Sequence, residues 1–370
     1  MATQSTVLET SSFEAAFSVK DEERSTVMRR FSTLILDTGS SRKQGSNGYV
    51  CRAVNVFGET YAVKMMRTNP TATPIPGFPV DKEAEGAIMA FREEYEIQKM
   101  LAPMNGFPKV FGYGTTKGNP VIVMEWIEGM TLKDMAESLD SDNRVPMGMA
   151  VASALFGILK QLDVFRIRPV HRDLSPSNVM ISLSEHSFKE QLASGRFDLR
   201  IIDFGSTALV DNTNPSFTAH TSILRRATPE YAPPEMLSDT LPNILELRKS
   251  PSIDVYAASS IIYELLTGRT THMVSKNREV LPYHAKCTLP PRPSVKYFTH
   301  YLGKDKEKAI TKFIDLLMKA FSQDQAERPS AKALSDAIDA VLAGSSLDRR
   351  PDSRNAESGT QGQSGRNGLQ

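Results

Sequence analysis

Apolar and polar positions in the first third of the chain follow the short, interrupted runs that are typical of β-strands. Runs rich in apolar and β-branched residues cover 32–36, 48–54, 60–66 and 120–125, and clusters of Gly, Asn and Ser separate them. The segment 56–59, which reads Val-Phe-Gly-Glu, lies between the second and third runs. Such runs with turn residues between them predict antiparallel hairpins.

A helical period follows the strands. We expect a helix over about 81–101, because Ala87, Ala90, Ile97 and Leu101 recur at the spacing of one helix face. Glu94 falls within the same stripe. A carboxylate on an inward face needs a buried partner, so Glu94 is a candidate functional residue.

Beyond residues 125–129 the period becomes helical for most of the remaining chain. Two amphipathic stripes stand out: Ile310, Phe313, Ile314, Leu317, Met318 and Phe321, then Leu334, Ala337, Ile338, Val341 and Leu342. Strands followed by helices predict an α+β fold with a cleft between a small antiparallel β lobe and a larger helical lobe.

The ends and one connector differ in composition from this core. We expect one main domain over 31–344, with the small lobe at about 31–125, a hinge at about 125–129 and the large lobe at about 130–344. Residues 1–30 are compatible with either a short helix or a mobile extension. Four prolines within 69–79 predict an extended connector. The polar tail 345–370 has almost no apolar residues, so we expect it to be disordered.

Composition narrows the class of partner and compartment. The chain has 370 residues and a formal net charge of +1, with both signs dispersed, which gives no reason to expect nucleic acid or an anionic membrane as partner. Two cysteines, Cys51 and Cys287, are too few for a disulfide framework and indicate a reducing compartment. The most apolar stretch, 150–159, is too short to span a bilayer. We therefore predict a soluble cytoplasmic protein.

Four motifs occur in a fixed order along the chain. The first, at 61–64, reads Tyr-Ala-Val-Lys, and the loop 170–178 reads Val-His-Arg-Asp-Leu-Ser-Pro-Ser-Asn. Asp-Phe-Gly stands at 203–205, and 228–235 reads Thr-Pro-Glu-Tyr-Ala-Pro-Pro-Glu. This order resembles the signature set of the eukaryotic-like, or Hanks-type, Ser/Thr protein kinases. The resemblance covers roughly 34–342.

The resemblance implies a phosphotransferase that uses ATP and Mg²⁺ and phosphorylates a protein substrate. Lys64 would contact the α- and β-phosphates, and Glu94 would pair with Lys64. The family pattern has an apolar residue four places after this glutamate, but Gln98 stands there, whereas Ile97 follows Glu93 by four. Glu93 therefore stays open as the alternative partner. Asp173 would orient the acceptor hydroxyl and take its proton. Asn178 and Asp203 would hold Mg²⁺, a hard cation that prefers oxygen ligands.

The nucleotide pocket is implied in the same way. Its candidate lining comprises Gly45, Gly48, Val50, Ala62, Met124, Glu125 and Ile127. Met124 resembles the residue at the back of the adenine pocket, and Glu125 and Ile127 would offer backbone groups to the adenine edge. In the glycine-rich loop, Lys43 stands at the first glycine position, which predicts a weaker clamp on the phosphates.

Two further departures from the family pattern concern the catalytic loop and the segment after it. Ser175 stands where Ser/Thr kinases usually carry a Lys that contacts the γ-phosphate. A nearby Arg or a second metal ion are candidates to replace that charge. Residues 184–196 form an insertion, which we expect to be a surface hairpin or a short helix.

Other residues match structural and specificity positions of the family. Thr228 and the residues after it resemble the Ser/Thr pattern rather than that of tyrosine kinases, and Thr228 would bond to Asp173. Glu235 and Arg328 resemble the family's structural ion pair. Asp254 resembles the helix Asp that anchors the catalytic loop.

Arg172 implies regulation. In relatives with this Arg, a phosphate on the activation segment pairs with the guanidinium and orders the loop. The candidates for that phosphate are Thr221 and Ser222, then Thr218, and we expect autophosphorylation there.

Two other classes stay open. Lys43 and Ser175 are compatible with a pseudokinase, a nucleotide-binding scaffold without transfer activity, although the catalytic residues are all present. A small-molecule phosphotransferase shares the loop Asp and Asn but should lack the peptide-holding run at 228–235.

Overall fold

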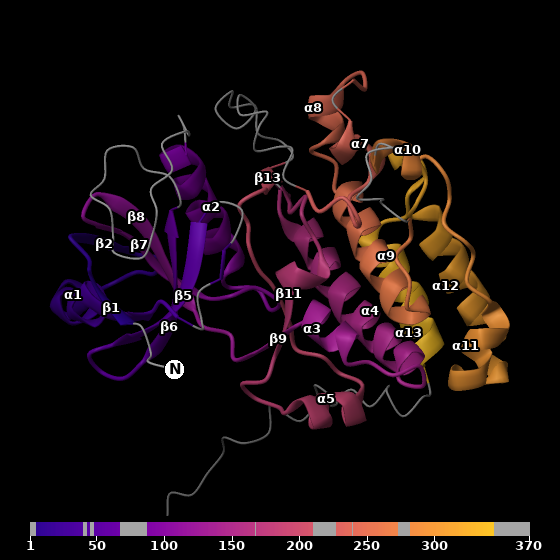
Figure 1. Ribbon diagram of the computed structural model, residues 1–370, viewed down its shortest axis with the longest axis horizontal. Coiled ribbons are helices and arrows are strands. Elements are labelled where there is room, and N and C mark those ends of the chain that lie inside the picture. Colours follow the sequence, from indigo (N-terminus) through magenta and orange to yellow (C-terminus); the bar gives the residue numbers. More distant parts are fainter. Residues whose placement is uncertain are drawn as a thin grey trace, which may run out of the picture.

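The computed structural model describes residues 5–39, 43–44, 48–66, 87–166, 168–209, 227–238, 240–272 and 282–343. A sheet-rich lobe and a larger helical lobe lie side by side, with the strands β9 (Gly129–Thr131) and β11 (Val179–Ser182) in the region between them (Figure 1). The predicted α+β fold with two lobes is confirmed.

The sheet of the small lobe is antiparallel, in the order β1-β3-β5-β6-β8-β7-β2, with β4 paired to β5. Four of its strands match the predicted runs: β3 (Thr33–Asp37), β5 (Gly48–Asn55), β6 (Thr60–Met66) and β8 (Asn119–Glu125). The strands β4 (Lys43–Gln44) and β7 (Val110–Thr116) lie outside those runs. Gly58 has a φ of 80° in the turn between β5 and β6, a conformation that favours glycine.

The small lobe includes residues N-terminal to the predicted domain start at residue 31. They form β1 (Ser5–Glu9), β2 (Ser12–Ala15) and α1 (Arg24–Ser32), a short helix of the kind left open as one of two alternatives for this segment. β1 pairs with β3 at one border of the sheet and β2 pairs with β7 at the other. Because Glu9 and Ser12 are three residues apart, at most about 11 Å separates them. The sheet is therefore curled until its two borders meet at Thr10 and Ser11.

Aromatic side chains fill the curled sheet. Phe13 of β2 stacks on Phe31 of α1 with 4.5 Å between ring centroids, and Phe31 meets Tyr61 edge to face at 5.3 Å. Phe31 is 1% exposed. The N-terminal strands thus contribute to the core of the lobe as well as to the border of its sheet.

The helix α2 (Ala87–Leu101) packs on the same sheet, against β6, β7 and β8. Its buried side chains include Phe91, Tyr95, Ile97 and Leu101, together with Glu94. The helix confirms the predicted period from residue 87 onward. Residues 81–86 and the connector 69–79 lie outside the described residues.

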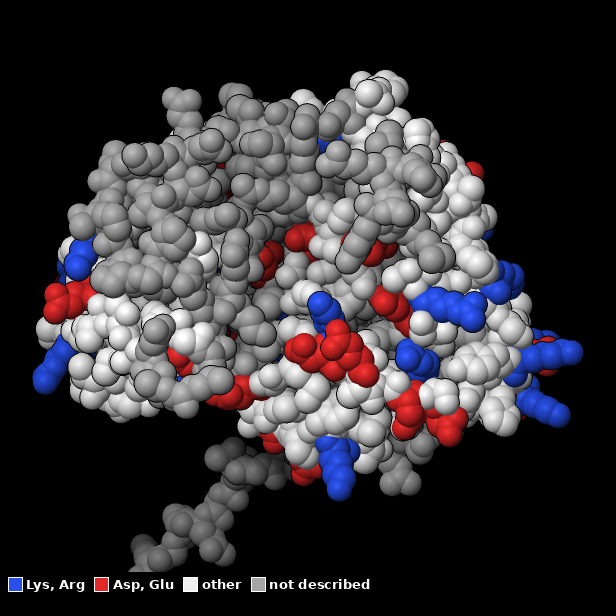
Figure 2. Space-filling model, in the orientation of Figure 1, with Lys and Arg blue, Asp and Glu red and all other residues white. Residues whose placement is uncertain are grey.

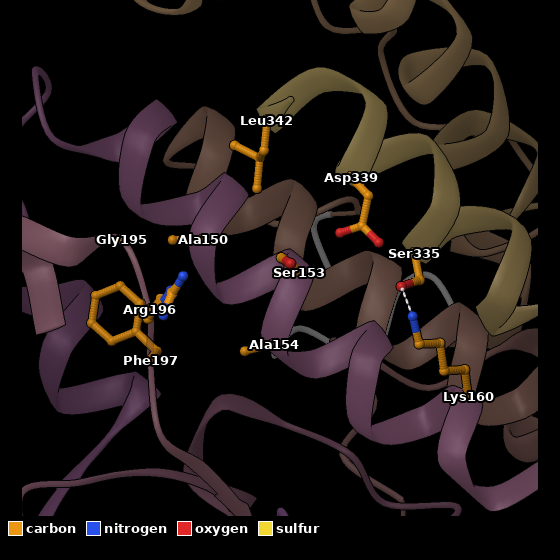
Figure 3. A pocket seen from close by; sticks show the side chains of 10 residues that line it. All are labelled: Ala150, Ser153, Ala154, Lys160, Gly195, Arg196, Phe197, Ser335, Asp339 and Leu342. Carbon is orange, nitrogen blue, oxygen red and sulfur yellow. Dashed lines mark hydrogen bonds between the residues drawn. The ribbon is translucent and has the colours of Figure 1, made fainter. Parts of the chain in front are cut away.

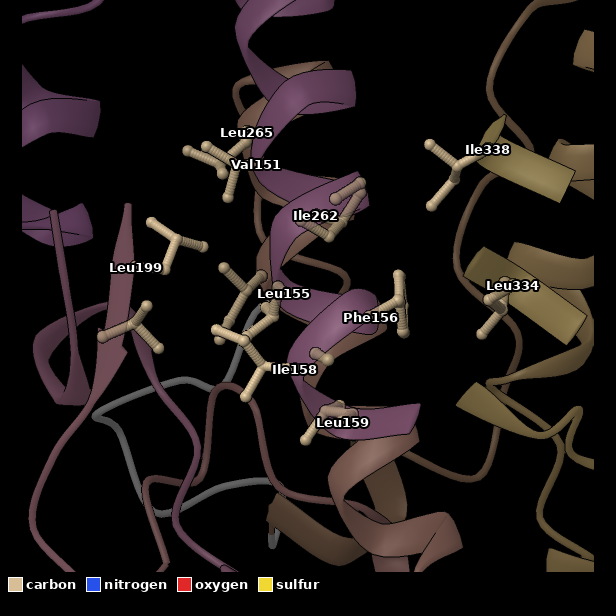
Figure 4. Close-up of a cluster of buried hydrophobic side chains, with 14 of the residues drawn as sticks. Val151, Leu155, Phe156, Ile158, Leu159, Leu199, Ile262, Leu265, Leu334 and Ile338 are labelled. Atoms are coloured by element: carbon tan, nitrogen blue, oxygen red, sulfur yellow. The ribbon is translucent and has the colours of Figure 1, made fainter. Parts of the chain in front are cut away.

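The large lobe is built around α4 (Arg144–Gln161), which contacts α9 (Ser252–Thr267) and α13 (Ala331–Leu342). Figure 4 shows Phe156 of α4 lying between Leu199 of β12 (Leu199–Ile201) and Leu334 of α13. Within the described part of the chain, one stretch, Arg144–Val164, is long and apolar enough to cross a membrane. Its most apolar window is 67% buried in the fold, so the core of the lobe accounts for its composition.

The remaining elements complete the large lobe. The strands are β9 (Gly129–Thr131), β10 (Pro169–Val170), β11 (Val179–Ser182), β12 (Leu199–Ile201) and β13 (Ala208–Leu209). The helices are α3 (Leu132–Glu137), α5 (Phe188–Ser194), α7 (Pro234–Leu237), α8 (Ile244–Leu247), α10 (Pro282–Ala285), α11 (Val295–Leu302) and α12 (Glu307–Lys319).

The insertion 184–196 contains the helix α5, one of the two forms predicted for it. Ser187 and Glu190 form a reciprocal capping box at its start, and Gly195 ends it in a left-handed conformation. Gln191 is 2% exposed, and its amide nitrogen donates to the carbonyl of Ser182 at 2.5 Å. That buried amide fixes the helix to β11.

Candidate active site

Lys64 lies at the centre of a buried charge cluster. Its Nζ donates to Glu94 Oε1 at 2.5 Å and to Asp203 Oδ1 at 2.8 Å. Burial on its own would lower the pKa of Lys64, but the carboxylates of Asp203 and Glu94 raise it. Lys64 therefore stays charged although it is 1% exposed. The partner on α2 is Glu94, which resolves the alternative between Glu94 and Glu93.

Gln98 occupies the position one turn after Glu94 where the family pattern has an apolar residue. Its Nε2 donates to Glu94 Oε1 at 2.9 Å, and the side chain is 4% exposed. Lys64 and Gln98 thus bind the same carboxylate oxygen. The departure from the pattern adds a hydrogen bond to the cluster.

Asp254 of α9 holds the backbone of the loop 170–178 by hydrogen bonds. Its two carboxylate oxygens accept from the backbone N–H groups of His171, at 2.8 Å, and Arg172, at 2.9 Å. Arg172 has a φ of 67°, and such a left-handed conformation costs about 1–2 kcal/mol for a residue with a side chain. The bonds to Asp254 offset that cost and fix the direction in which Asp173 leaves the loop.

Asp173 is held on both of its oxygens. Thr228 donates to Oδ1 from its backbone N–H, at 2.9 Å, and from its hydroxyl, at 2.8 Å. Asn178 Nδ2 donates to Oδ2 at 3.2 Å and to the Asp173 carbonyl at 2.8 Å. Desolvation raises the pKa of Asp173, and the bonds from Thr228 oppose that rise. The carboxylate is thus oriented and more basic than an exposed Asp.

Asp203 lines the same cavity as Asp173, on the side of Lys64. Its φ is 64°, a conformation that non-glycine residues adopt rarely and that concentrates at functional sites. Phe204 beside it is buried against His171 at 5.2 Å and Phe107 at 5.9 Å between centroids. The buried ring anchors the segment, so the Asp203 carboxylate is placed between Lys64 and the catalytic loop.

A cavity of about 390 Å³ opens between the lobes beside Lys64. Its lining brings together five residues of the candidate nucleotide pocket, namely Val50, Ala62, Met124, Glu125 and Ile127. The backbone N–H of Glu125 donates to the carbonyl of Lys109 at 2.8 Å, so this N–H is already bound within the small lobe.

The glycine-rich loop is only partly described. Gly45 lies outside the described residues. At Gly48, an added Cβ would come within 2.1 Å of the Met65 carbonyl oxygen, so the close pairing of β5 with β6 requires glycine there. Lys43 forms part of β4, which pairs with β5.

A second cavity, of about 680 Å³, lies in front of Asp173. Its lining includes Glu137, Glu230 and Glu264 together with Lys133 and Arg144. Figure 2 shows acidic side chains gathered over α3, beside the opening between the lobes. We refer to this cavity as the acceptor cavity and to the first as the nucleotide cavity, after the roles proposed for them below.

A third hollow, of about 310 Å³, lies behind α4 and away from these residues. It is lined by α4, α13 and the chain after α5, and Lys160 Nζ donates to Ser335 Oγ across it at 2.8 Å (Figure 3). None of the predicted site residues lines it.

The predicted structural pair is formed. Arg328 donates to both carboxylate oxygens of Glu235, at 2.6 and 2.9 Å, with the two side chains 0% and 3% exposed. Arg172 is buried and donates from Nε to the carbonyl of Ser206 at 2.5 Å. Thr218, Thr221 and Ser222 lie outside the described residues.

Sequence reasoning missed Lys286. It is 0% exposed, its Nζ donates to the carbonyl of Glu230 at 2.6 Å, and it lies 5.6 Å from the centre of the Tyr256 ring. Glu230 belongs to the run that starts at Thr228, so Lys286 fixes the segment that holds Asp173. No motif surrounds this lysine, and its burial depends on partners distant in sequence.

The two lobes bring together a buried lysine–carboxylate pair, an oriented Asp173 and two oxygen-bearing side chains between two cavities. This arrangement is typical of the two-lobed phosphotransferases. The family described as the protein kinase domain matches residues 43–337. The chain therefore belongs to the protein kinase domain family, and the predicted resemblance is confirmed.

Relatives in bacteria and plants agree with this family. The chain is 29% identical over 157 residues to a probable serine/threonine-protein kinase PknB of Bifidobacterium longum, covering 42% of this chain and 19% of that one. It is 26% identical to serine/threonine-protein kinase pkn2 of Myxococcus xanthus, over 63% and 25% of the two chains. It is 22% identical to calmodulin-binding receptor-like cytoplasmic kinase 2 of Arabidopsis thaliana, over 80% of this chain and 66% of that one. The matched region thus spans less than two thirds of the two bacterial kinases and about two thirds of the plant kinase.

Proposed function

We propose that the chain is a Ser/Thr protein kinase that transfers the terminal phosphate of ATP to a protein hydroxyl. The observation that carries this is the double hydrogen bond from Thr228 to Asp173. These bonds connect the segment 228–235, which resembles the peptide-holding segment of protein kinases, to the carboxylate that would take the proton of the acceptor hydroxyl. A small-molecule phosphotransferase has no need for such a segment.

Each residue of the cluster has a role in this reaction. Asp173 orients the acceptor hydroxyl and takes its proton, helped by the raised pKa of the carboxyl. Lys64, held by Glu94, orients the α- and β-phosphates. Thr228 keeps Asp173 in the direction of the acceptor cavity.

The donor set fits Mg²⁺. Asp203 and Asn178 both line the two cavities, and carboxylate and amide oxygens suit this cation. The nitrogen of the Asn178 amide is bound to Asp173, so the amide oxygen is the atom available to a metal. When bound, Mg²⁺ would neutralise charge on the phosphates.

The nucleotide would lie in the cavity of about 390 Å³, with its adenine against Val50, Ala62 and Met124. Glu125 and Ile127 would contribute backbone groups at the edge of the ring. Gly45 and Gly48 would bring backbone close to the phosphates.

Regulation and location are part of the same proposal. We infer autophosphorylation of the activation segment, with Thr221 or Ser222, and next Thr218, as the site and Arg172 as the cation that receives the phosphate. A soluble, cytoplasmic enzyme agrees with the two cysteines and the dispersed charge. A pseudokinase is the second candidate, favoured by the buried, uncharged Ser175.

Intact-mass spectrometry tests the proposal. The purified chain is incubated with Mg²⁺ and ATP beside the variant Asp173→Asn, which keeps the shape of the side chain. We expect phosphate to be added to the natural chain and not to the variant. If neither gains mass while ATP still raises the melting temperature, the chain is a pseudokinase. Phosphorylation of a mixed Ser/Thr peptide library, but not of aminoglycosides or choline, would exclude the small-molecule class.

A further inference from the structure

The nucleotide cavity and the acceptor cavity share a short border. Four residues line both: Lys133, Ser177, Asn178 and Asp203. A phosphoryl group that moves from a nucleotide in one cavity to a hydroxyl in the other must pass this border. The four residues therefore flank the transfer path of the proposed reaction.

Lys133 is the cation among these four. It is the second residue of α3, whose start is fixed by the capping box of Thr131 and Asp134. Leu132 and Met135 are 0% exposed, and α3 packs against the 3-10 turn Pro176–Asn178 of the catalytic loop. The helix is thus fixed in rotation and position, and Lys133 projects to the border of the cavities.

The charge of Lys133 is available to a ligand. The side chain is exposed, and in the described part of the chain it forms no ion pair, even with Glu137 one turn later. Lys64, by contrast, is bound by two carboxylates on the nucleotide side. Arg144 lines only the acceptor cavity and donates to the carbonyl of Leu139 at 3.4 Å.

The catalytic loop lacks a cation of its own after Arg172. Ser175 stands where kinases of this type carry a lysine for the γ-phosphate, and it is uncharged and 3% exposed. We propose that Lys133 supplies this missing charge to the phosphoryl group in transfer. This inference rests on the proposed kinase activity and names a further catalytic residue for it.

In the proposed transfer, one bond to the terminal phosphorus breaks while another forms. The bond from the terminal phosphorus to the bridging oxygen of the nucleotide breaks, and a bond from that phosphorus to the acceptor oxygen forms. The acceptor proton passes to Asp173, and the bridging oxygen leaves with the diphosphate. The ammonium of Lys133 stabilises the negative charge spread over the phosphoryl oxygens, an effect that is strongest in the transition state.

The test compares Lys133→Met and Lys133→Arg in the full chain, with casein and ATP as substrates. We expect Lys133→Met to lower kcat at least tenfold and to change KM for ATP less than threefold, because the charge acts on the transition state. Lys133→Arg should retain most of the rate. The exposed Lys189 of α5 provides the control, and Lys189→Met should match the natural chain.

A rescue separates this role from a structural one. Adding Ser175→Lys to Lys133→Met should restore at least a third of the natural kcat, whereas Ser175→Lys alone should gain less than twofold. If Lys133→Met stays within twofold of the natural rate, or if Lys133→Arg fails to retain activity, the proposal is overturned.

A binding measurement covers the case in which the chain does not turn over, so that the two proposals can fail separately. Lys133→Met should reduce the preference for ATP over ADP severalfold by calorimetry with Mg²⁺, because only ATP carries the terminal phosphate. An unchanged preference in a chain without turnover would overturn the role of Lys133. Turnover that depends on Asp173 but not on Lys133 would leave the kinase activity standing alone.

Discussion

Gln98 and Lys64 bind the same oxygen of Glu94, one from α2 itself and one from β6. The amide thereby stabilises the carboxylate on which the position of Lys64 depends. An isosteric change to Gln98→Glu would place a second carboxylate beside Glu94 and repel it. We expect kcat/KM to fall by about tenfold or more, equivalent to about 1.4 kcal/mol. Gln98→Met, which loses only the hydrogen bond, should cost less, and equal losses in the two variants would contradict this role.

The pH dependence of turnover should report on Asp173. Its pKa is raised by burial, so the carboxyl is protonated, and activity lost, at a higher pH than for an exposed Asp. The hydroxyl of Thr228 lowers that pKa. In Thr228→Ala the acidic limb of the kcat profile should therefore move to higher pH, while Thr228→Ser should keep it in place. A limb that is the same in all three proteins would show that another group controls it.

The pair of Glu235 and Arg328 should be essential for stability. Removing one partner of a buried pair leaves an uncompensated charge and costs about 3–5 kcal/mol. We expect Arg328→Met to lower the free energy of unfolding by that amount in urea titrations. Lys332 and Asp336 form an exposed pair, with side chains 69% and 54% exposed, and Lys332→Met should change stability by less than about 0.5 kcal/mol.

Lys286 should make stability rise in alkaline solution. Desolvation lowers its pKa to about 8 in the folded chain, below the value of about 10.4 expected when unfolded. Between these values the unfolded chain binds more protons, so stability rises with pH. Relative to Lys286→Met, the natural chain should gain about 1 to 3 kcal/mol between pH 8 and pH 10.5. Parallel unfolding curves for the two proteins would contradict a buried charge at this position.

Gly112 should be required for the docking of β2. A Cβ at this position would come within 2.3 Å of the Phe13 ring and 2.5 Å of the Glu14 carbonyl oxygen, so Gly112→Ala should displace β2 from β7. Hydrogen exchange should then rise in residues 12–15 and not in α9. Gly157 has nothing within 4 Å of an added Cβ, and Gly157→Ala serves as the matched control.

The sequence predicts the central strands well because their signals are local. β6 coincides with the predicted run 60–66, in which turn residues stand next to a continuous apolar segment. β1 and β2 were missed because they contribute few large apolar side chains, chiefly Leu8 and Phe13. β1 pairs with β3 and β2 pairs with β7 because the sheet curls. A short polar segment gives no sequence signal for that curl.

The residues of the candidate site also differ in whether the local sequence identifies them. Lys64, Asp173 and Asp203 could be assigned from the order of motifs, because each lies in a short run of fixed spacing. The choice of Glu94 over Glu93 needed the structure, since Gln98 removed the apolar marker that would have decided it. Lys133 could not be singled out at all, because its position depends on how α3 packs against the catalytic loop.

The border of the small lobe also bears on how the chain folds. Ser12 and its partner Thr115 are 103 residues apart, so β2 is synthesised long before β7 exists. β2 must therefore wait for this distant partner, and contacts of such long separation form slowly. Until residue 116 is available, the curled sheet cannot close, and the nascent small lobe exposes unpaired strands that a chaperone would recognise.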